Sequence, residues 1–450
     1  MQRFATRIVE VFDRYMPEPF AFGILMTMVA MLVAWTTTES TALDVVVYWG
    51  NGLSSLLAFI TQVSLTILFA FALAHLGPVP ALLARLSAVP RTPASAYAFC
   101  AVFTSAVCLL AWPLGTILGG LMARQVAMRF HERGVAVHYP LLGGAAFAGF
   151  VVWHMGYSGS APLLVATAGN PMEAMLGGTL PVTETLLSNF NLVTMAATVA
   201  AVAFCASRLG PDEEHTETIS DEQRNREAET GPAMEAPQRE GFAGAVENAR
   251  WPTTIIGLVL LAYLVNWFYE KGAQLELNVV NWTFLTLCLL LAKSPLNLTN
   301  VMMQAGRAVI PTLLQYPLYA GIMGLMMMSG VVANMADYFA QTASRETLPL
   351  IAFLSGGLIN LFIPSGGAQW AVQGPAFLEA AQLLGTDPAL VVMGVAYGDQ
   401  WTNIIHPFVA IPLLIMTGLK ASKVLSYSFL LFFVAGLTLG SGILVASLTR

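Results

Sequence analysis

The chain has 450 residues, of which 56% are hydrophobic and only 10% are charged. A water-soluble protein carries about 25% charged residues, so this composition excludes a soluble enzyme, a nucleic-acid-binding protein and a disordered chain. The formal net charge of −6 lies entirely in one connector, 207–250, which holds eleven of the 26 acidic residues and five of the 20 basic ones.

Long apolar runs recur from end to end, which predicts an all-α, polytopic membrane protein. Before the first run, residues 4–16 place Phe4, Ile8, Phe12 and Tyr15 near one helical face. Such a face predicts a helix that lies in the membrane interface and contacts lipid. The connector 207–250 has few apolar residues to bury, so we expect a disordered, cytoplasmic, acidic linker.

Two pairs of apolar runs are too short to cross the membrane twice. After Pro113 only ten residues precede Arg124, and after Pro364 only fourteen precede Glu379. A crossing needs about 20 apolar residues, whereas eleven helical residues extend only about 16 Å, to the midplane. We therefore expect re-entrant hairpins over 94–128 and 348–383. Their tips, Pro113-Leu114-Gly115 and Pro364-Ser365-Gly366-Gly367, must line protein or a wet cavity.

About nine membrane-spanning helices remain. If the N-terminus is cytoplasmic, the predicted inner loops and ends carry seventeen of the 20 basic residues, and only Lys271, Arg345 and Arg450 lie outside. This bias predicts a cytoplasmic N-terminus and an external C-terminus.

The chain contains an internal repeat. Gln62 precedes Pro113 by 51 residues and Gln315 precedes Pro364 by 49. Each half then continues with a helix interrupted by small and polar residues, over 140–168 and 389–418. One additional helix, 252–270, reverses the second copy, so the repeat is expected to be inverted, with a site at the midplane. The predicted organisation is a first repeat with the interfacial helix in 1–206, the linker 207–250, and the connecting helix with the second repeat in 251–450.

The interrupted helices suggest how an anion would bind. Broken helices expose N–H groups and a partial positive charge at their N-terminal ends, and no Lys or Arg falls near the predicted midplane. Hydroxyl and amide groups near the breaks are the other candidate ligands, although each hydroxyl has the alternative of bonding to its own helix carbonyl. These candidates are Thr116, Ser158, Ser160, Asn170, Ser365, Thr402 and Asn403.

Three titratable residues are candidates for ion coupling. Asp399 is the only acid in the broken-helix core, and a charged Asp there costs about 2.5 to 3.5 kcal/mol, so it needs a cation, a proton or N–H groups. It therefore predicts proton or sodium coupling, with helix capping as the alternative. His154 and His406 flank the interruptions and are further candidates, against a purely structural role.

Four tryptophans and four cysteines lie in the apolar runs. Trp112, Trp153, Trp370 and Trp401 fall near the tips and breaks, where they would wall an apolar slot or simply pack. The cysteines have no CxxC spacing, and we expect no metal site and no cofactor other than a coupling H⁺ or Na⁺.

Several motifs run almost end to end along the chain: Trp49-Gly50-Asn51-Gly52, Tyr157-Ser158-Gly159-Ser160-Ala161-Pro162-Leu163-Leu164, Gly169-Asn170-Pro171, Ile363-Pro364-Ser365-Gly366-Gly367 with Trp370, Gln373-Gly374-Pro375, and Ala396-Tyr397-Gly398-Asp399-Gln400-Trp401. In these motifs the sequence resembles the short-chain fatty acid transporters, a bacterial inner-membrane family within the ion-transporter superfamily. The resemblance implies uptake of small monocarboxylates such as acetoacetate or butyrate, and a homodimer with a scaffold and a moving transport domain. Gly159 at the first break, and Gly366 and Gly367 at the second tip, are also predicted substrate-binding residues.

Three other functions remain as alternatives. Gly156-Tyr157-Ser158-Gly159 matches the GxSG of rhomboid-like intramembrane serine proteases, with His154 or His406 as base, but a protease does not explain two hairpins. Two hairpins can also build a channel. A dicarboxylate carrier would need more positive potential than this core supplies.

Overall fold

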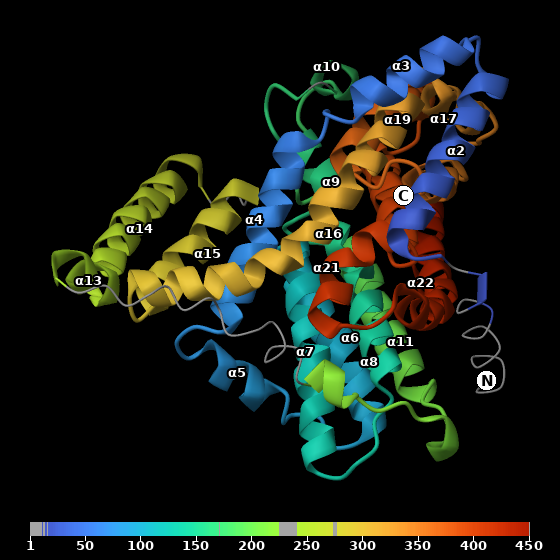
Figure 1. Cartoon of the computed structure of the whole chain (residues 1–450). Coiled ribbons are helices and arrows are strands. Elements are labelled where there is room, and N and C mark those ends of the chain that lie inside the picture. The colour runs from blue at the N-terminus through green and yellow to red at the C-terminus, as the bar shows by residue number, and fades with distance from the viewer. Residues whose placement is uncertain are drawn as a thin grey trace.

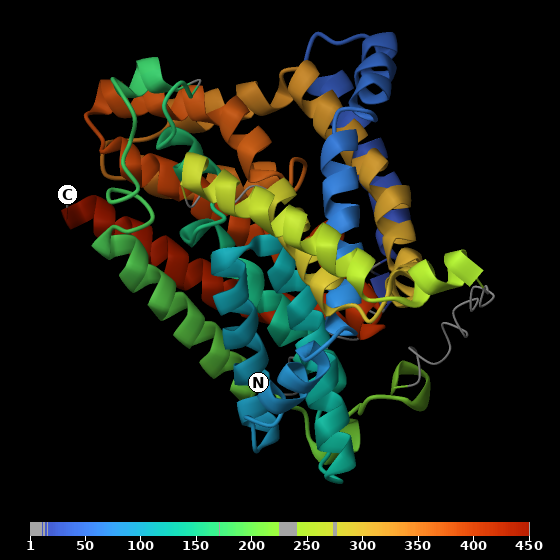
Figure 2. The same ribbon diagram turned by 90° about the vertical axis from the view of Figure 1, so that its left-hand side faces the viewer.

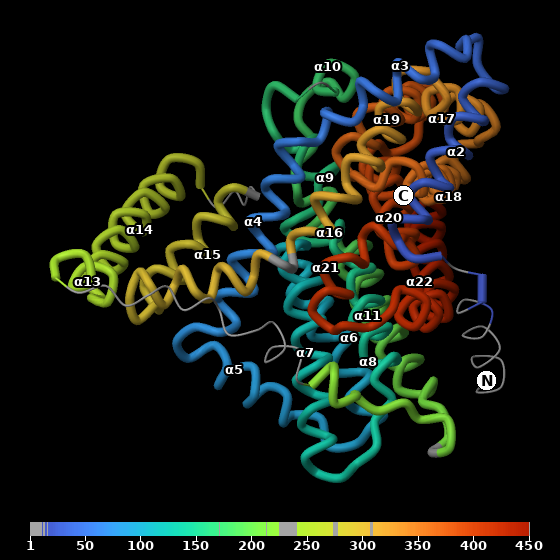
Figure 3. The backbone as a smooth tube through the Cα atoms, viewed as in Figure 1, coloured from blue at the N-terminus to red at the C-terminus, as the bar shows by residue number. Residues whose placement is uncertain are grey.

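The computed structural model describes residues 11, 14–15, 17–170, 172–224, 241–272 and 277–449. Every regular element in these ranges is a helix (Figures 1 and 3). Most of the predicted interfacial helix 4–16 lies outside the described residues.

Seven described helices are long and apolar enough to cross a membrane, which confirms the all-α, polytopic class. The predicted count of nine crossings stays a prediction. The seven candidates are Pro19–Thr37, Leu57–Ala74, Pro93–Leu110, Asn189–Arg208, Trp251–Lys271, Val309–Met328 and Ala421–Thr449.

One group of helices is built around the 34-residue helix α16 (Pro295–Met328), which contains Pro311 and Pro317. Its neighbours α2, α3 and α4 pack against it, and α15 joins through α4. α14 packs on α15 and leaves most of its apolar surface exposed, on the left in Figure 1. The bounds of this first group are α2 (Pro19–Thr37), α3 (Ala42–Gly52), α4 (Leu57–Ala74), α5 (Val79–Leu86), α13 (Gly241–Asn248), α14 (Trp251–Lys271) and α15 (Leu277–Leu291).

The second group combines both halves of the chain. α6 and α7 pack against α8, while α11 packs along α22, and these last two run side by side in Figure 2. The bounds are α6 (Pro93–Leu110), α7 (Trp112–Glu132), α8 (Tyr139–Ala148), the 3₁₀ helix η1 (Gly149–Met155), α9 (Ser160–Val165), α10 (Glu173–Leu176), α11 (Asn189–Arg208), η2 (Glu213–His215), α17 (Val331–Gln341), α18 (Leu348–Asn360), α19 (Gly366–Leu384), α20 (Pro388–Asn403), α21 (Pro407–Thr417) and α22 (Ala421–Thr449).

The first tip lies slightly earlier than predicted. Ala111 is extended, with φ −153° and ψ 107°, and α7 begins at Trp112, so Pro113 and Gly115 belong to its first turn. Proline is favoured there because the first N–H groups of a helix have no intrahelical acceptor. In the second tip Ser365 is the extended residue, and Gly366 opens α19.

The second helix break is not where the sequence placed it. α20 continues through Gly398 and Asp399 to Asn403, and the break falls at 404–406. Pro407 is the cause, because proline lacks an N–H and forces the preceding His406 into an extended conformation, with φ −91° and ψ 116°. Gly398 instead lets α20 approach the main chain of α18 at Phe353. The predicted alternative that Asp399 caps the second half-helix is therefore wrong.

The described part of the acidic connector is held against the helices. The N–H of Tyr139 donates to the carbonyl of Glu217 at 2.8 Å, and Lys423 Nζ pairs with the Glu217 carboxylate at 3.0 Å. Ile219 is buried. The expectation that the whole connector is disordered is wrong for this segment, because it offers a buried apolar side chain and main-chain partners.

Candidate functional site

A central cavity of about 90 Å³ lies where the two tips and the two breaks meet. Its lining includes Trp112 from the first tip, Ser160 from the first break, Pro364 to Gly366 from the second tip, and Asn403 from the end of α20. Segments about 250 residues apart in the sequence therefore line one small cavity.

An adjoining cavity of about 290 Å³ shares Phe59, Trp112 and Ser160 with the central one. It extends along the first tip, from Leu110 to Pro113, and along the first break. Neither lining contains a Lys, Arg, Asp or Glu among the described residues. Any anion held here would therefore depend on dipoles rather than on a cationic side chain.

The start of α19 supplies such dipoles. Ser365 is its N-cap but makes no side-chain capping bond, and Gly366, the first helical residue, lines the central cavity. The first N–H groups of a helix have no carbonyl partner within it. These uncapped N–H groups and the partial positive charge at the helix end suit a carboxylate or another small anion.

Aromatic rings form the apolar side of the central cavity. The ring centroids of Phe408 and Tyr316 are 4.1 Å apart, those of Tyr316 and Phe59 are 6.3 Å apart, and those of Phe59 and Trp112 are 6.2 Å apart. The ring centroid of Trp153 lies 5.9 Å from that of Trp112. We call these five residues the aromatic wall. Phe59 on α4 and Tyr316 on α16 come from the first helix group, so the cavity lies between the two groups.

Six predicted binding residues line the two cavities: Ser158, Gly159, Ser160, Ser365, Gly366 and Asn403. The hydroxyl of Ser158 donates to the carbonyl of Cys108 at 2.8 Å or of Trp153 at 3.2 Å, so it faces main chain. Within the described part of the chain, the hydroxyls of Ser160 and Ser365 make no hydrogen bond, which leaves both available to a ligand.

The other predicted binding residues are not among those that line these cavities. Thr116 bonds to the carbonyl of Pro113 at 3.1 Å, and the amide of Asn170 bonds locally to the Thr167 carbonyl at 2.8 Å. The indole N–H of Trp401 donates to the carbonyl of Phe432 at 2.9 Å, and the rings of the two residues stack. Thr402 accepts a bond from Asn360 at 2.9 Å. Of α19 only its first residue, Gly366, lines the central cavity, and Gly367 and Trp370 do not.

His154 joins the first break to α20. Its backbone N–H donates to Gln400 Oε1 at 2.9 Å, and its Nδ1 lies 3.2 Å from the carbonyl of Ala396. Nε2 has no hydrogen-bond partner among the described residues. The Ser158 hydroxyl bonds to main-chain carbonyls and not to the imidazole of His154, so these two residues do not form the nucleophile–base pair of the protease alternative.

Asp399 lies next to the cavity rather than in it. Its Oδ1 accepts a bond from Asn403 Nδ2 at 2.8 Å, and Asn403 Oδ1 accepts one from Asn360 Nδ2 at 2.9 Å. Asp399 is buried, and none of the described residues forms a hydrogen bond with its second oxygen, Oδ2. Asn403 therefore touches both the cavity and the buried acid.

His406 occupies the second break as the N-cap of α21. Its Nε2 lies 3.2 Å from the carbonyl of Leu361, and its ring meets Tyr319 edge to face at 5.6 Å. The ring is buried and does not line either cavity.

Sequence reasoning missed Phe59, Tyr316, Phe408 and Gln62 as lining residues. Gln62 was recognisable only as a marker of the repeat, and it bonds to Asn278 at 2.9 Å. An aromatic residue in an apolar run carries no signal that separates a cavity wall from ordinary packing.

Comparisons with known proteins identify the same family that the sequence motifs resemble. A family model described as short chain fatty acid transporter matches residues 1–446. A relative from Escherichia coli (strain K12) is 37% identical over 447 residues, covering 98% of this chain and 99% of that protein. Another, from Haemophilus influenzae, is 32% identical over 442 residues, covering 95% of each chain. Both relatives are named, provisionally, as short-chain fatty acid transporters.

Among solved structures, the crystal structure of the YdaH transporter of Alcanivorax borkumensis has a TM-score of 0.46 to this chain. The two sequences are 16% identical, and the match covers 95% of this chain and 98% of that one.

Proposed function

Because the chain belongs to the short-chain fatty acid transporter family and is not an enzyme, we propose that it is a secondary active carrier of small monocarboxylates such as acetoacetate or butyrate. The observation that carries this proposal is the central cavity, where the tips and breaks of both halves meet around uncapped N–H groups and free hydroxyls.

The carboxylate would lie at the start of α19, against Gly366 and the hydroxyls of Ser365 and Ser160, and Asn403 lines the same cavity. The acyl chain would lie against the aromatic wall. Three buried methylene-sized groups contribute only about 2.4 kcal/mol, whereas millimolar affinity requires about 4 kcal/mol. Millimolar affinity therefore requires contacts to both the carboxylate and the acyl chain. A site without a basic side chain favours one carboxylate over two.

The two halves would work as inverted repeats. α6, α7 and the broken helix α8 to α9 correspond in order to α18, α19 and the broken helix α20 to α21. With the first helix group as scaffold and the second as the moving part, the aromatic wall lies at their boundary, where relative motion would open the cavity to each side in turn.

Asp399 would couple transport to a proton or a sodium ion. Asn403 bonds to Asp399 and also lines the cavity, so occupation of one site changes the environment of the other. A buried acid with one unpartnered oxygen is stabilised by a proton or a cation.

The carrier would reside in a bacterial inner membrane, with its N-terminus cytoplasmic and its C-terminus external. A homodimer is expected, as the family resemblance implies.

Uptake of C2 to C6 acids by proteoliposomes, with proton and sodium gradients varied separately, tests the proposal. Saturable counterflow of labelled butyrate is expected, and non-saturable flux would indicate a channel instead. Preference for a dicarboxylate would contradict the monocarboxylate assignment.

Asp399→Asn tests the coupling role. The variant should retain counterflow, which needs no gradient, but lose accumulation driven by the coupling ion. Asp337→Asn, which changes an exposed acid on α17, is the matched control. Unchanged gradient-driven accumulation in Asp399→Asn would rule out coupling through Asp399 without affecting the carrier assignment.

A further inference from the structure

A larger cavity of about 660 Å³ lies at the opposite ends of the helices that reach the central cavity. α19 runs from Gly366 at the centre to Gln382 here, and α20 runs from Pro388 here to Asn403 at the centre. At 1.5 Å per residue, the two cavities are about 20 to 25 Å apart. We call this second space the distal cavity. It lies beside α10, at the top of Figure 1, whereas the connector that follows α11 is at the bottom.

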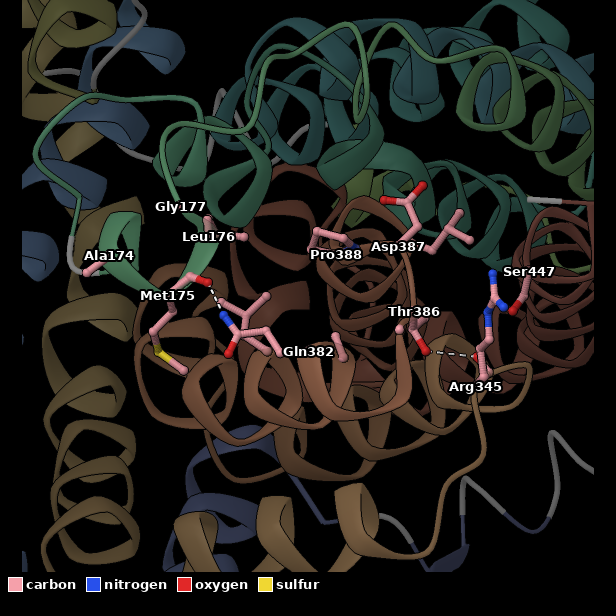
Figure 4. Close-up of a pocket in the computed structure, with 14 residues that line it drawn as sticks. Ala174, Met175, Leu176, Gly177, Arg345, Gln382, Thr386, Asp387, Pro388 and Ser447 are labelled. Atoms are coloured by element: carbon pink, nitrogen blue, oxygen red, sulfur yellow. Dashed lines mark hydrogen bonds between the residues drawn. The ribbon is translucent and has the colours of Figure 1, made fainter.

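The distal cavity is amphipathic. Leu176, Leu378 and Leu390 supply apolar surface, and Arg345 is the single basic residue among the described residues that line it. Figure 4 shows the Arg345 side chain reaching toward Ser447, while the Asp387 carboxylate points away from it. Asp387 caps α20 by accepting the N–H of Ala389 at 2.8 Å.

The backbone around Arg345 is held in place. Thr386 Oγ1 donates to the Arg345 carbonyl at 3.0 Å, and Ser447 Oγ donates to the Glu346 carbonyl at 2.7 Å. The opposite wall is fixed by a hydrogen bond from Gln382 to the carbonyl of Met175, drawn in Figure 4. These contacts hold the two walls of the distal cavity in place.

The Arg345 guanidinium makes no ion pair with another described residue. The neighbouring Glu346 carboxylate accepts a bond from Ser344 Oγ at 3.0 Å instead. A guanidinium presents paired N–H donors that match a carboxylate, and no side chain in the described ranges forms a hydrogen bond with those donors.

We propose that the distal cavity is a second binding site for a small monocarboxylate, with Arg345 holding the carboxylate and the three leucines contacting the acyl chain. This proposal rests on the proposed function for its choice of ligand. With the N-terminus cytoplasmic, the site faces outward, where a positive charge raises the local concentration of anionic substrate before it enters the transport path.

Alkylation of Ser447→Cys by iodoacetamide in reconstituted protein tests the site, with the wild-type chain giving the background from its native cysteines. At a butyrate concentration of twice its dissociation constant, about one third of the sites remain free, so alkylation should slow about threefold. 1-Butanol, which has the same chain without the charge, should not protect. Arg345→Gln should abolish the protection, and Arg345→Lys should retain part of it. Lys271→Gln, on α14 away from the cavity, is the matched control.

Equal protection by butyrate in the Arg345→Gln background, or protection by 1-butanol, would overturn the proposal. Asn403→Ala separates this proposal from the proposed function, because it should abolish uptake while leaving protection of Ser447→Cys intact. Loss of protection in Asn403→Ala would mean that butyrate acts only at the centre. Protection without saturable uptake in the wild-type chain would contradict the carrier and support the distal site.

Discussion

The imidazole of His154 occupies the space that a side chain on Gly366 would need. These residues come from the first break and the second tip, so the two halves touch at the edge of the central cavity. Gly366 thus serves close packing, since its φ is not in the left-handed region.

Gly366→Ala should therefore disrupt the central site. The added methyl group meets His154 Nε2 and the ring of Trp153, and overpacking costs about 1 to 3 kcal/mol. We expect uptake of butyrate to fall by about 5-fold to 150-fold, because each 1.4 kcal/mol is a factor of ten. Gly367→Ala is the control, since its nearest neighbour, the Cβ of Ser160, lies 4.0 Å away. Equal loss in both variants would refute the steric argument.

Gln400→Leu should destabilise the fold. The change leaves the buried N–H of His154 without its acceptor, at a cost of about 1 to 3 kcal/mol. Thermal unfolding in detergent should show a lower midpoint than for Gln341→Leu, which alters an exposed glutamine on α17. Equal unfolding midpoints for the two variants would show that water or another group replaces Gln400 as the acceptor for the His154 N–H.

Phe59→Ala should broaden the range of acids that are carried. Removing one ring from the aromatic wall enlarges a cavity of about 90 Å³, so the ratio of hexanoate to butyrate uptake should rise. Each buried methylene adds about 0.8 kcal/mol, or roughly fourfold in affinity. Phe71→Ala, on the same helix but facing His75, is the control. An unchanged ratio would place the acyl chain elsewhere.

His138 should make stability depend on pH. It lies in the loop before α8, where its Nδ1 accepts the N–H of Glu217 at 2.9 Å and its Nε2 lies 2.8 Å from the hydroxyl of Tyr427. Burial lowers the pKa of His138 from 6.5 to about 4, and the nearby positive charge of Lys423 lowers it as well. The unfolded chain therefore binds more protons between these values, so this stabilisation is complete above pH 6.5 and declines as the pH falls toward 4.

His138→Gln should flatten that dependence by up to about 1.4 kcal/mol per pH unit. Unfolding midpoints at pH 7.5 and 5.0 measure the difference, and His131→Gln, which changes an exposed histidine, should retain the full slope. Parallel slopes for wild type and His138→Gln would exclude this contribution.

The sequence by itself determined the membrane class, the family and the regions where helices break. The apolar composition requires that the long helices lie in lipid. Pro113, Pro162 and Pro364 fall within or beside the observed tips and first break. Only the tertiary structure decided that the second break falls at 404–406, just before Pro407, rather than at Gly398, because close packing between α18 and α20 uses the glycine without interrupting the helix. It also decided that Ser160 and Ser365 face the cavity while Thr116 and Thr402 do not. The rotation of each helix against its neighbours sets which side chains share a cavity, and the order of residues along one chain does not fix that rotation.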